Sequence, residues 1–130
     1  MSTMTLEISR GDVVLIAFPF VADGQFQRKL RPAVVVQADR YNRRRSAVII
    51  AAITGMRTHA RLPSKLAVEK ASPEGRSAGL KLDSVVDCQT LATLPKDEIV
   101  RRLGKFPDDF MRRADQALAD ALGLPTPARR

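Results

Sequence analysis

The stretch Arg31-Pro32-Ala33-Val34-Val35-Val36-Gln37 joins a basic segment directly to an apolar run. Four consecutive apolar residues bounded by polar ones are typical of a buried strand, and proline is tolerated where a strand begins. We therefore predict a strand over residues 31–37. The polar residues and Gly24 that precede it predict a loop over residues 21–30.

Further strands are predicted on both sides of this stretch, most of them from short apolar runs and the one over residues 65–68 from alternation of apolar and polar residues. They cover residues 11–18, 47–54, 65–68, 83–88 and 90–94. Because several short strands follow one another closely, the sequence favours a mainly β fold over alternating strands and helices. The mainly β alternatives are a small barrel and a sandwich.

The apolar period becomes helical near the C-terminus. The residues with this spacing are Phe110, Ala114, Ala117, Leu118, Ala121 and Leu122. Pro107 suits the first helical position and Gly123 the position just after a helix, so we predict a helix over residues 107–122. Phe106 stands where a capping Ser or Thr is expected, at a cost of about 1 kcal/mol. A shorter helix is predicted over residues 97–103.

Nearly all of the excess positive charge lies in one third of the chain. Residues 24–65 contain ten Lys or Arg residues and one acid, Asp39, and so carry +9, compared with +8 for the whole chain. The same segment contains the two most apolar runs, residues 33–36 and 47–53. A segment that is both core-forming and strongly cationic predicts a folded surface that binds a polyanion, with RNA or DNA the first candidate.

The composition excludes several classes of protein. A length of 130 residues predicts one domain, and no apolar run approaches the roughly 18 residues of a transmembrane helix, so no membrane partner is expected. The polar N-terminal residues lack a secretory signal, which predicts a cytoplasmic protein. With one cysteine, Cys88, and one histidine, His59, we expect no intramolecular disulfide, no dedicated metal site and no cofactor. Cys88 is interpreted as a small buried apolar residue.

Five short motifs occur in a fixed order along the chain. They are Arg10-Gly11-Asp12-Val13-Val14-Leu15, residues 27–37, Ala51-Ala52-Ile53-Thr54-Gly55, Asp83-Ser84-Val85-Val86, and Leu103-Gly104 followed by a helix that closes on Leu122-Gly123-Leu124. Each motif alone is common. In this order and spacing they resemble the MazF/PemK family of toxin ribonucleases, also called Kid, over about residues 10–124.

The resemblance implies an SH3-like small β-barrel with a C-terminal α-helix, working as a homodimer. It divides the chain into an N-terminal extension of residues 1–9, a barrel domain of residues 10–124 and a C-terminal tail of residues 125–130. It also implies metal-independent cleavage of single-stranded RNA, such as mRNA, at short sequence motifs. The implied protein partner is a cognate antitoxin with an acidic, flexible C-terminal segment.

The family's catalytic residues fall on Arg31 and Thr54 when the motifs are matched. Metal-free RNA cleavage uses the 2′-hydroxyl of the RNA as nucleophile and yields a 2′,3′-cyclic phosphate and a 5′-hydroxyl. The planar fork of an arginine suits phosphate oxygens, and a threonine hydroxyl can donate a hydrogen bond to the phosphorane. Residue type alone favours a strand-start arginine paired with an acid for Arg31, and a β-forming residue at a strand end for Thr54; the resemblance reverses both interpretations.

Further basic and polar residues near these two are candidates for binding RNA. Arg28 could bind phosphate and Gln27 could contact a base edge, although both could also be solvated loop residues. Arg57, His59 and Arg61 share a basic loop that could contact RNA. Histidine is the usual acid or base in metal-free ribonucleases, but the motif does not assign this role to His59.

One segment departs from the family pattern of acid-Gln-x-Arg-Thr after the fifth strand. Gln89 stands in place of the acid and Ala92 in place of the arginine, while the nearby Asp87 could substitute for the lost carboxylate. The departure leaves two alternatives open: a non-catalytic RNA-binding module on the same fold, and a gyrase-targeting toxin. Gyrase-targeting relatives end in a Trp-bearing helix, whereas this chain contains no Trp.

Overall fold

The computed structural model describes residues 7–55 and 62–125. It contains one six-stranded sheet with the strand order β4-β5-β3-β2-β1-β6, in which all paired neighbours run antiparallel. The strands are β1 Asp12–Ala22, β2 Gln25–Val35, β3 Ala47–Gly55, β4 Lys65–Val68, β5 Ser84–Pro95 and β6 Ile99–Lys105. The helices are α1 Asp39–Asn42, α2 Pro73–Ser77, the 3-10 turn η1 Lys96–Glu98, and α3 Asp108–Leu122. This confirms a mainly β fold with a C-terminal helix.

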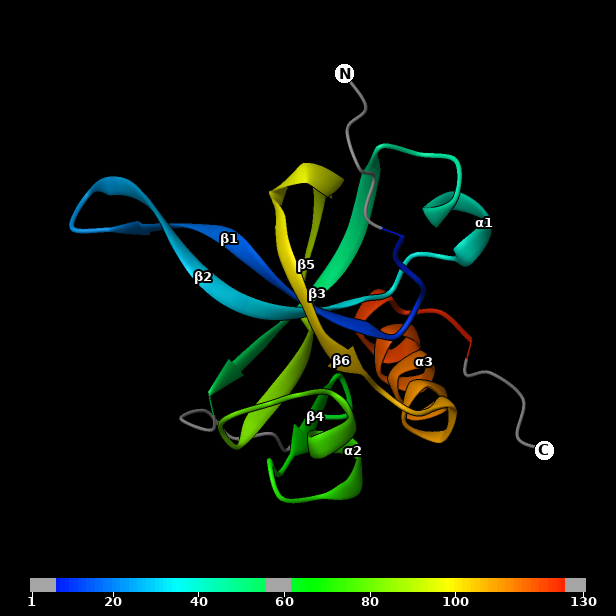
Figure 1. Ribbon diagram of the computed structural model, residues 1–130. Helices are drawn as coiled ribbons and strands as arrows, with labels where there is room; N and C mark the ends of the chain where they lie inside the picture. Colours follow the sequence, from blue (N-terminus) through cyan, green and yellow to red (C-terminus); the bar gives the residue numbers. More distant parts are fainter. Residues whose placement is uncertain (1–6, 56–61, 126–130) are drawn as a thin grey trace.

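The sheet is strongly twisted, and α3 covers one of its faces (Figure 1). Alternation along the strands divides the core into two clusters. The α3-facing cluster includes Val13, Val34, Ala51, Ile53, Val86, Phe110, Met111, Ala114 and Ala117. The cluster on the other face includes Ile8, Val14, Ile16, Ala33, Val35, Val48 and Ile50. Among the described strands β4 and β6 remain edges, so the SH3-like sheet curls without closing into a full cylinder.

The C-terminal helix begins after Pro107 and ends before Gly123, close to the predicted bounds. Gly123 has a φ of 69°, the left-handed conformation that glycine adopts easily. Pro107 is the residue just before the helix rather than its first residue, and no side chain caps this end. Phe106 compensates, because it is buried and stacks on Phe110 with ring centroids 4.0 Å apart. Apolar packing therefore anchors the helix start where a polar cap was expected.

The loop predicted over residues 21–30 is wrong, because residues 25–30 belong to β2. Asp23 and Gly24, with φ values of 52° and 71°, form a two-residue turn that pairs Ala22 with Gln25. An Asp-Gly dipeptide is a strong hairpin signal, since both turn residues need positive φ. The side chains of residues 25–30 are exposed on an arm that projects from the sheet (Figure 1), which explains why their polarity suggested a loop.

Two other predictions also change. The short helix predicted over residues 97–103 is wrong: only η1 is helical, and β6 pairs with β1 along the sheet edge. Tertiary pairing here overrides the local pattern. The two strands predicted over residues 83–88 and 90–94 are one strand, β5, with a register shift opposite Ala51 and Ala52. The apparent gap between the two runs is therefore a β-bulge.

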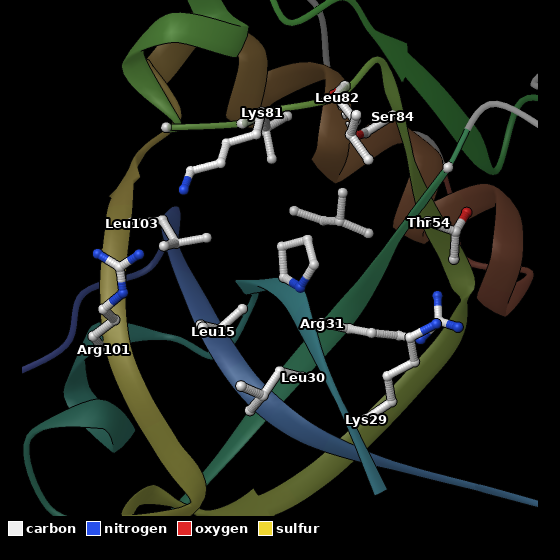
Figure 2. Close-up of a pocket in the computed structure, with 15 residues that line it drawn as sticks. Leu15, Lys29, Leu30, Arg31, Thr54, Lys81, Leu82, Ser84, Arg101 and Leu103 are labelled. Carbon is white, nitrogen blue, oxygen red and sulfur yellow. Dashed lines mark hydrogen bonds between the residues drawn. The ribbon is translucent and has the colours of Figure 1, made fainter.

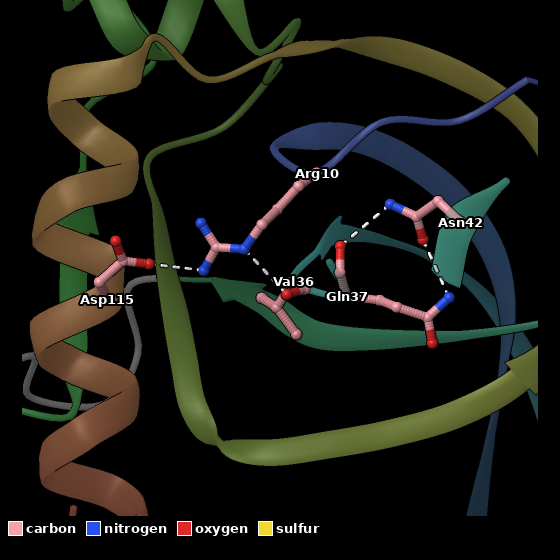
Figure 3. Close-up of polar contacts among 5 residues, drawn as sticks. All are labelled: Arg10, Val36, Gln37, Asn42 and Asp115. Carbon is pink, nitrogen blue, oxygen red and sulfur yellow. Dashed lines mark hydrogen bonds and ion pairs between the residues drawn. The ribbon is translucent and has the colours of Figure 1, made fainter. Parts of the chain in front are cut away.

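Hydrogen bonds fix the end of β2 that lies away from the hairpin (Figure 3). Arg10 donates from Nε to the Val36 carbonyl at 2.9 Å and from Nη2 to Asp115 on α3 at 2.6 Å. Asn42 on α1 donates to the Gln37 carbonyl at 3.0 Å, and the Gln37 amide donates back to Asn42 Oδ1 at 2.9 Å. These contacts hold β2 against α1 and α3. Within the two described ranges, no helix is long and apolar enough to cross a membrane.

Candidate RNA-binding and catalytic site

A cavity of about 370 Å³ opens between β1, β2, β3, β6 and the segment that joins α2 to β5 (Figure 2). Arg31 from β2 and Thr54 from β3 both line it. Its volume lies in the range of small-ligand sites, about 300–1,000 Å³. The structure therefore brings together the two residues that the sequence singled out as the catalytic pair, although 23 positions separate them in the chain.

The register between β2 and β3 explains why Arg31 and Thr54 meet. Ala33 pairs with Ala52, and the two strands pair through only three residue positions before the ladder stops. Continuing the same register by two residues would place Arg31 directly opposite Thr54. The two side chains therefore stand on the same face of the sheet, where the strands have just separated.

Pro32 accounts for the separation of the two strands. Val36 donates its N–H to the Ile49 carbonyl on β3 at 3.1 Å. Every second residue of a strand turns its N–H group to the same neighbouring strand, and Pro32 lies four residues before Val36. The nitrogen of Pro32 therefore faces β3 as well. Proline has no N–H to donate, so the ladder cannot continue past it. The Arg-Pro motif thus both supplies the cation and opens the cavity beside it.

The cavity combines an apolar floor with cationic edges. Its apolar lining consists of Leu15, Leu30, Pro32, Ile53, Leu80, Leu82 and Leu103. Its cations are Lys29, Arg31, Lys81 and Arg101. Figure 2 shows Lys29 and Arg31 near Thr54 on one side, and Lys81 and Arg101 on the opposite side. No acidic residue of the described chain lines the cavity.

The four cavity cations are not neutralised by carboxylates. All 14 acidic side chains of the protein lie in the described residues, so none is hidden in the remainder. The ion pairs within residues 7–55 and 62–125 are Arg10–Asp115, Arg28–Glu98, Lys65–Asp87 and Arg102–Asp12. None of these involves a cavity cation. Arg31 is therefore not the acid-paired structural arginine that residue type alone allowed, and the cavity is suited to an anion.

The remaining sequence-predicted residues take different positions. Arg28 donates to Glu98 at 2.7 Å, so its charge is engaged with η1 rather than directed into the cavity. Gln27 is exposed on the hairpin arm, on the same strand face as Lys29 and Arg31 but outside the cavity lining. The loop candidates all lie outside the described residues; they are Arg57, His59 and Arg61.

Asp87 does not replace the missing family carboxylate at this cavity. It accepts hydrogen bonds from the Gln89 N–H at 2.9 Å and from the Thr90 hydroxyl at 3.0 Å, and so holds the β5 bulge. Neither Asp87, Gln89 nor Ala92 lines the cavity. The Ser84 hydroxyl, which does line it, already donates to the Leu82 carbonyl at 2.7 Å. Of the two lining hydroxyls, Thr54 is thus the one that donates to no acceptor within residues 7–55 and 62–125.

Sequence reasoning missed three of the four cavity cations. Lys29 had a local signal, because it lies two residues before Arg31 on the same strand and so shares its face. Lys81 and Arg101 had none, since they come from a loop and an edge strand far along the chain. Their convergence depends on the strand order, which puts β6 next to β1.

Cys88 has no part in this site. Its side chain is fully buried, and burial, with a smaller contribution from the charge of Asp87, raises the pKa of the thiol to about 11. We expect Cys88 in the folded protein to resist alkylation by iodoacetamide near pH 8 and to react quickly once the chain is unfolded in denaturant. Rapid modification of the native protein, measured by intact mass, would contradict this burial.

A small β protein with a curled antiparallel sheet and a cationic cavity of this kind is suited to binding phosphate-bearing polymers. The sequence family described as PemK-like, MazF-like toxin of type II toxin–antitoxin system matches residues 9–122. The chain belongs to this family.

Individual relatives agree with this assignment. A protein of Staphylococcus saprophyticus named endoribonuclease MazF is 34% identical over 117 residues, which cover 90% of this chain and 92% of that protein. A solved endoribonuclease from a mycobacterial species superposes with a TM-score of 0.72 at 26% identity, covering 96% of this chain and all of the other. A second mycobacterial endoribonuclease, solved with its cognate antitoxin, has a TM-score of 0.69 at 28% identity and covers 92% and 99% of the two chains.

Proposed function

We propose that this protein is a toxin endoribonuclease that cleaves single-stranded RNA, including mRNA, at short sequence motifs. The observation that carries the proposal is the cavity in which Arg31 and Thr54 stand together, with four cations and no acidic residue among the described lining. Family membership and the named activity of the Staphylococcus relative support the same reaction. A single-stranded substrate fits, because its backbone can enter a cavity that a regular duplex could not.

In the proposed reaction the 2′-oxygen of the RNA attacks the adjacent phosphorus. The new bond joins the 2′-oxygen to phosphorus, and the bond from phosphorus to the 5′-oxygen of the next nucleotide breaks. The 2′-hydroxyl loses its proton and the departing 5′-oxygen gains one. The products are a 2′,3′-cyclic phosphate and a 5′-hydroxyl.

Arg31 and Thr54 act on the phosphorus centre in this scheme. The Arg31 guanidinium binds the non-bridging oxygens, whose negative charge grows in the phosphorane, and Thr54 donates one further hydrogen bond. Arg31, with Lys29 on the same side of the cavity, supplies the positive charge that a metal ion would otherwise provide, so we propose that no metal is needed. The described part of the cavity contains no carboxylate or histidine that could move these protons.

The cavity also suggests how the toxin is restrained. An acidic, flexible segment of a cognate antitoxin would be attracted to the same uncompensated cations and would exclude RNA. The mycobacterial neighbour solved with its antitoxin supports a partner of this kind. We further propose that the protein acts as a homodimer in the cytoplasm.

The proposal is tested by incubating the purified chain with a long single-stranded RNA in the presence of EDTA. We expect discrete fragments, because cleavage at short motifs gives a reproducible pattern on a gel. A non-catalytic RNA-binding module is the second candidate, favoured by Gln89 and Ala92 in place of the family acid and arginine. RNA that is bound but stays intact at high protein concentration would decide for that module.

Thr54→Val is expected to lower kcat for RNA cleavage about tenfold while KM changes little, because one hydrogen bond to the transition state is lost. Valine keeps the β-branched shape of threonine, so the strand should fold as before. Thr54→Ser is the matched control, since it retains the hydroxyl, and its kcat should stay near that of the wild type. Equal losses in both variants would show that the hydroxyl has no role.

A further inference from the structure

We propose that Lys81 and Arg101 form a second phosphate-binding site, distinct from Arg31, which holds a phosphate of the RNA next to the one that is cleaved. This inference rests on the proposed function and extends it to two residues outside every family motif noted above. Both side chains are exposed, both line the cavity, and they lie together on the side opposite Arg31 (Figure 2).

The strand register sets the separation between the two cationic edges. Leu15 on β1 pairs with Arg101 on one side and with Pro32 on the other. Neighbouring strands lie roughly 4.8 Å apart, so the backbones of Arg101 and Pro32 are about 10 Å apart across the cavity floor. Because Arg31 precedes Pro32, its side chain turns to the opposite strand face from Arg101. Figure 2 shows Arg31 extending toward Thr54, away from Lys81 and Arg101. Two phosphates of one strand can therefore contact one edge each.

Lys81 is held near Arg101 by close backbone packing. Gly79, two residues before it, has a φ of 73°, and a Cβ added there would lie 2.3 Å from the Leu103 carbonyl oxygen on β6. The loop is therefore pressed directly onto the strand that carries Arg101. Because the loop is already held against β6, its backbone loses less conformational entropy when Lys81 and Arg101 bind an anion together.

The floor between the edges suits the sugar and base that join two phosphates. It is formed by aliphatic side chains such as Leu15, Leu30 and Leu103, which can pack against the flat apolar face of a base. The Ser84 hydroxyl already donates to a carbonyl, so between the two cationic edges the floor contacts a nucleotide mainly through apolar atoms. The cavity therefore holds this nucleotide mainly through its phosphates.

The test compares two double variants that each remove one lysine and one arginine from the full-length protein. Lys81→Ala/Arg101→Ala removes the proposed site, and Lys70→Ala/Arg112→Ala removes the same charges from exposed positions outside the cavity. All four side chains are exposed, so both variants should fold, which thermal unfolding would check. The probe is a short, fully 2′-O-methylated RNA strand of mixed sequence, which the proposed chemistry cannot cleave.

We expect the cavity variant to bind the probe about tenfold more weakly at moderate salt, because charge-assisted contacts are lost. Its plot of log affinity against log salt should become shallower by about 0.7 for the lost phosphate contact. The control variant should change both quantities far less. On a cleavable RNA the cavity variant should raise KM while kcat stays within a few-fold of the wild type.

Equal losses of affinity and equal salt slopes in the two variants would overturn the second phosphate site. Such a result would show that Lys81 and Arg101 attract RNA only through the net positive charge of the protein. Failure of the wild-type protein to cleave any long RNA would instead overturn the proposed function. The two failures are distinguishable, because the binding comparison uses a probe that does not depend on cleavage.

Discussion

Arg31→Ala should lower kcat for RNA cleavage by about 10²–10³-fold, the loss typical of removing one fixed donor from a developing charge. Arg31 lines the cavity with no acidic partner, so its charge is available to the phosphate rather than spent within the protein. Single-turnover cleavage of a labelled RNA measures the effect. Arg31→Lys should recover only part of the rate, because lysine keeps the charge but not the planar fork.

The matched control for this result is Arg112→Ala, which removes one arginine from the exposed surface of α3. It should cleave RNA at nearly the wild-type rate. Because Arg31 is partly exposed at the mouth of the cavity, its replacement should leave the unfolding temperature nearly unchanged. A folded Arg31→Ala protein with cleavage within a few-fold of the wild type would contradict the assigned role.

Gly104→Ala should lower the free energy of unfolding by about 3 kcal/mol, at the upper end of the usual cost of overpacking. A Cβ at this position would lie 2.3 Å from the Ser77 carbonyl oxygen and 2.6 Å from the Ala78 carbonyl carbon. Both contacts are with backbone, which cannot rotate away as the end of a side chain can. Urea unfolding of the variant and the wild type measures the difference.

Gly55→Ala provides the comparison for that result. A Cβ at Gly55 meets no atom of residues 7–55 or 62–125 within 4 Å, although Gly55 also ends a strand at the cavity. We expect a change in unfolding free energy of roughly 0.5 kcal/mol or less. If Gly104→Ala changed the unfolding free energy as little as Gly55→Ala, the close approach of the end of α2 to β6 would be wrong. The placement of Lys81 beside Arg101 would then be wrong as well.

The sequence carried most of the information about the central strands and the C-terminal helix. The apolar run after Pro32 and the helical spacing that starts at Phe110 are local patterns, so the first predicted the buried end of β2 and the second predicted α3 close to its observed bounds. The arm of the β1–β2 hairpin was missed because its exposed residues lack alternation, although Asp23-Gly24 marked the turn. The edge strand β6 was missed because pairing with β1 decides its conformation.

The proposed catalytic pair and the proposed second phosphate site differ in how far the sequence could predict them. Arg31 and Thr54 followed from the family resemblance, and the β2–β3 register now supplies the physical reason for their meeting. Lys81 and Arg101 could not be predicted, because only the strand order and the packing at Gly79 bring them to the cavity. Convergence of distant segments is a property of the fold rather than of any local pattern.

The most direct test of the account compares two RNAs that differ by one oxygen atom. After cleavage sites are mapped, the wild-type protein is given a short RNA with one site, and the same RNA with deoxyribose at the nucleotide that supplies the attacking hydroxyl, both in EDTA. We predict that the first is cleaved to a 2′,3′-cyclic phosphate and a 5′-hydroxyl, while the second is bound and stays intact. Cleavage of both RNAs, or cleavage that appears only with added metal, would contradict the account.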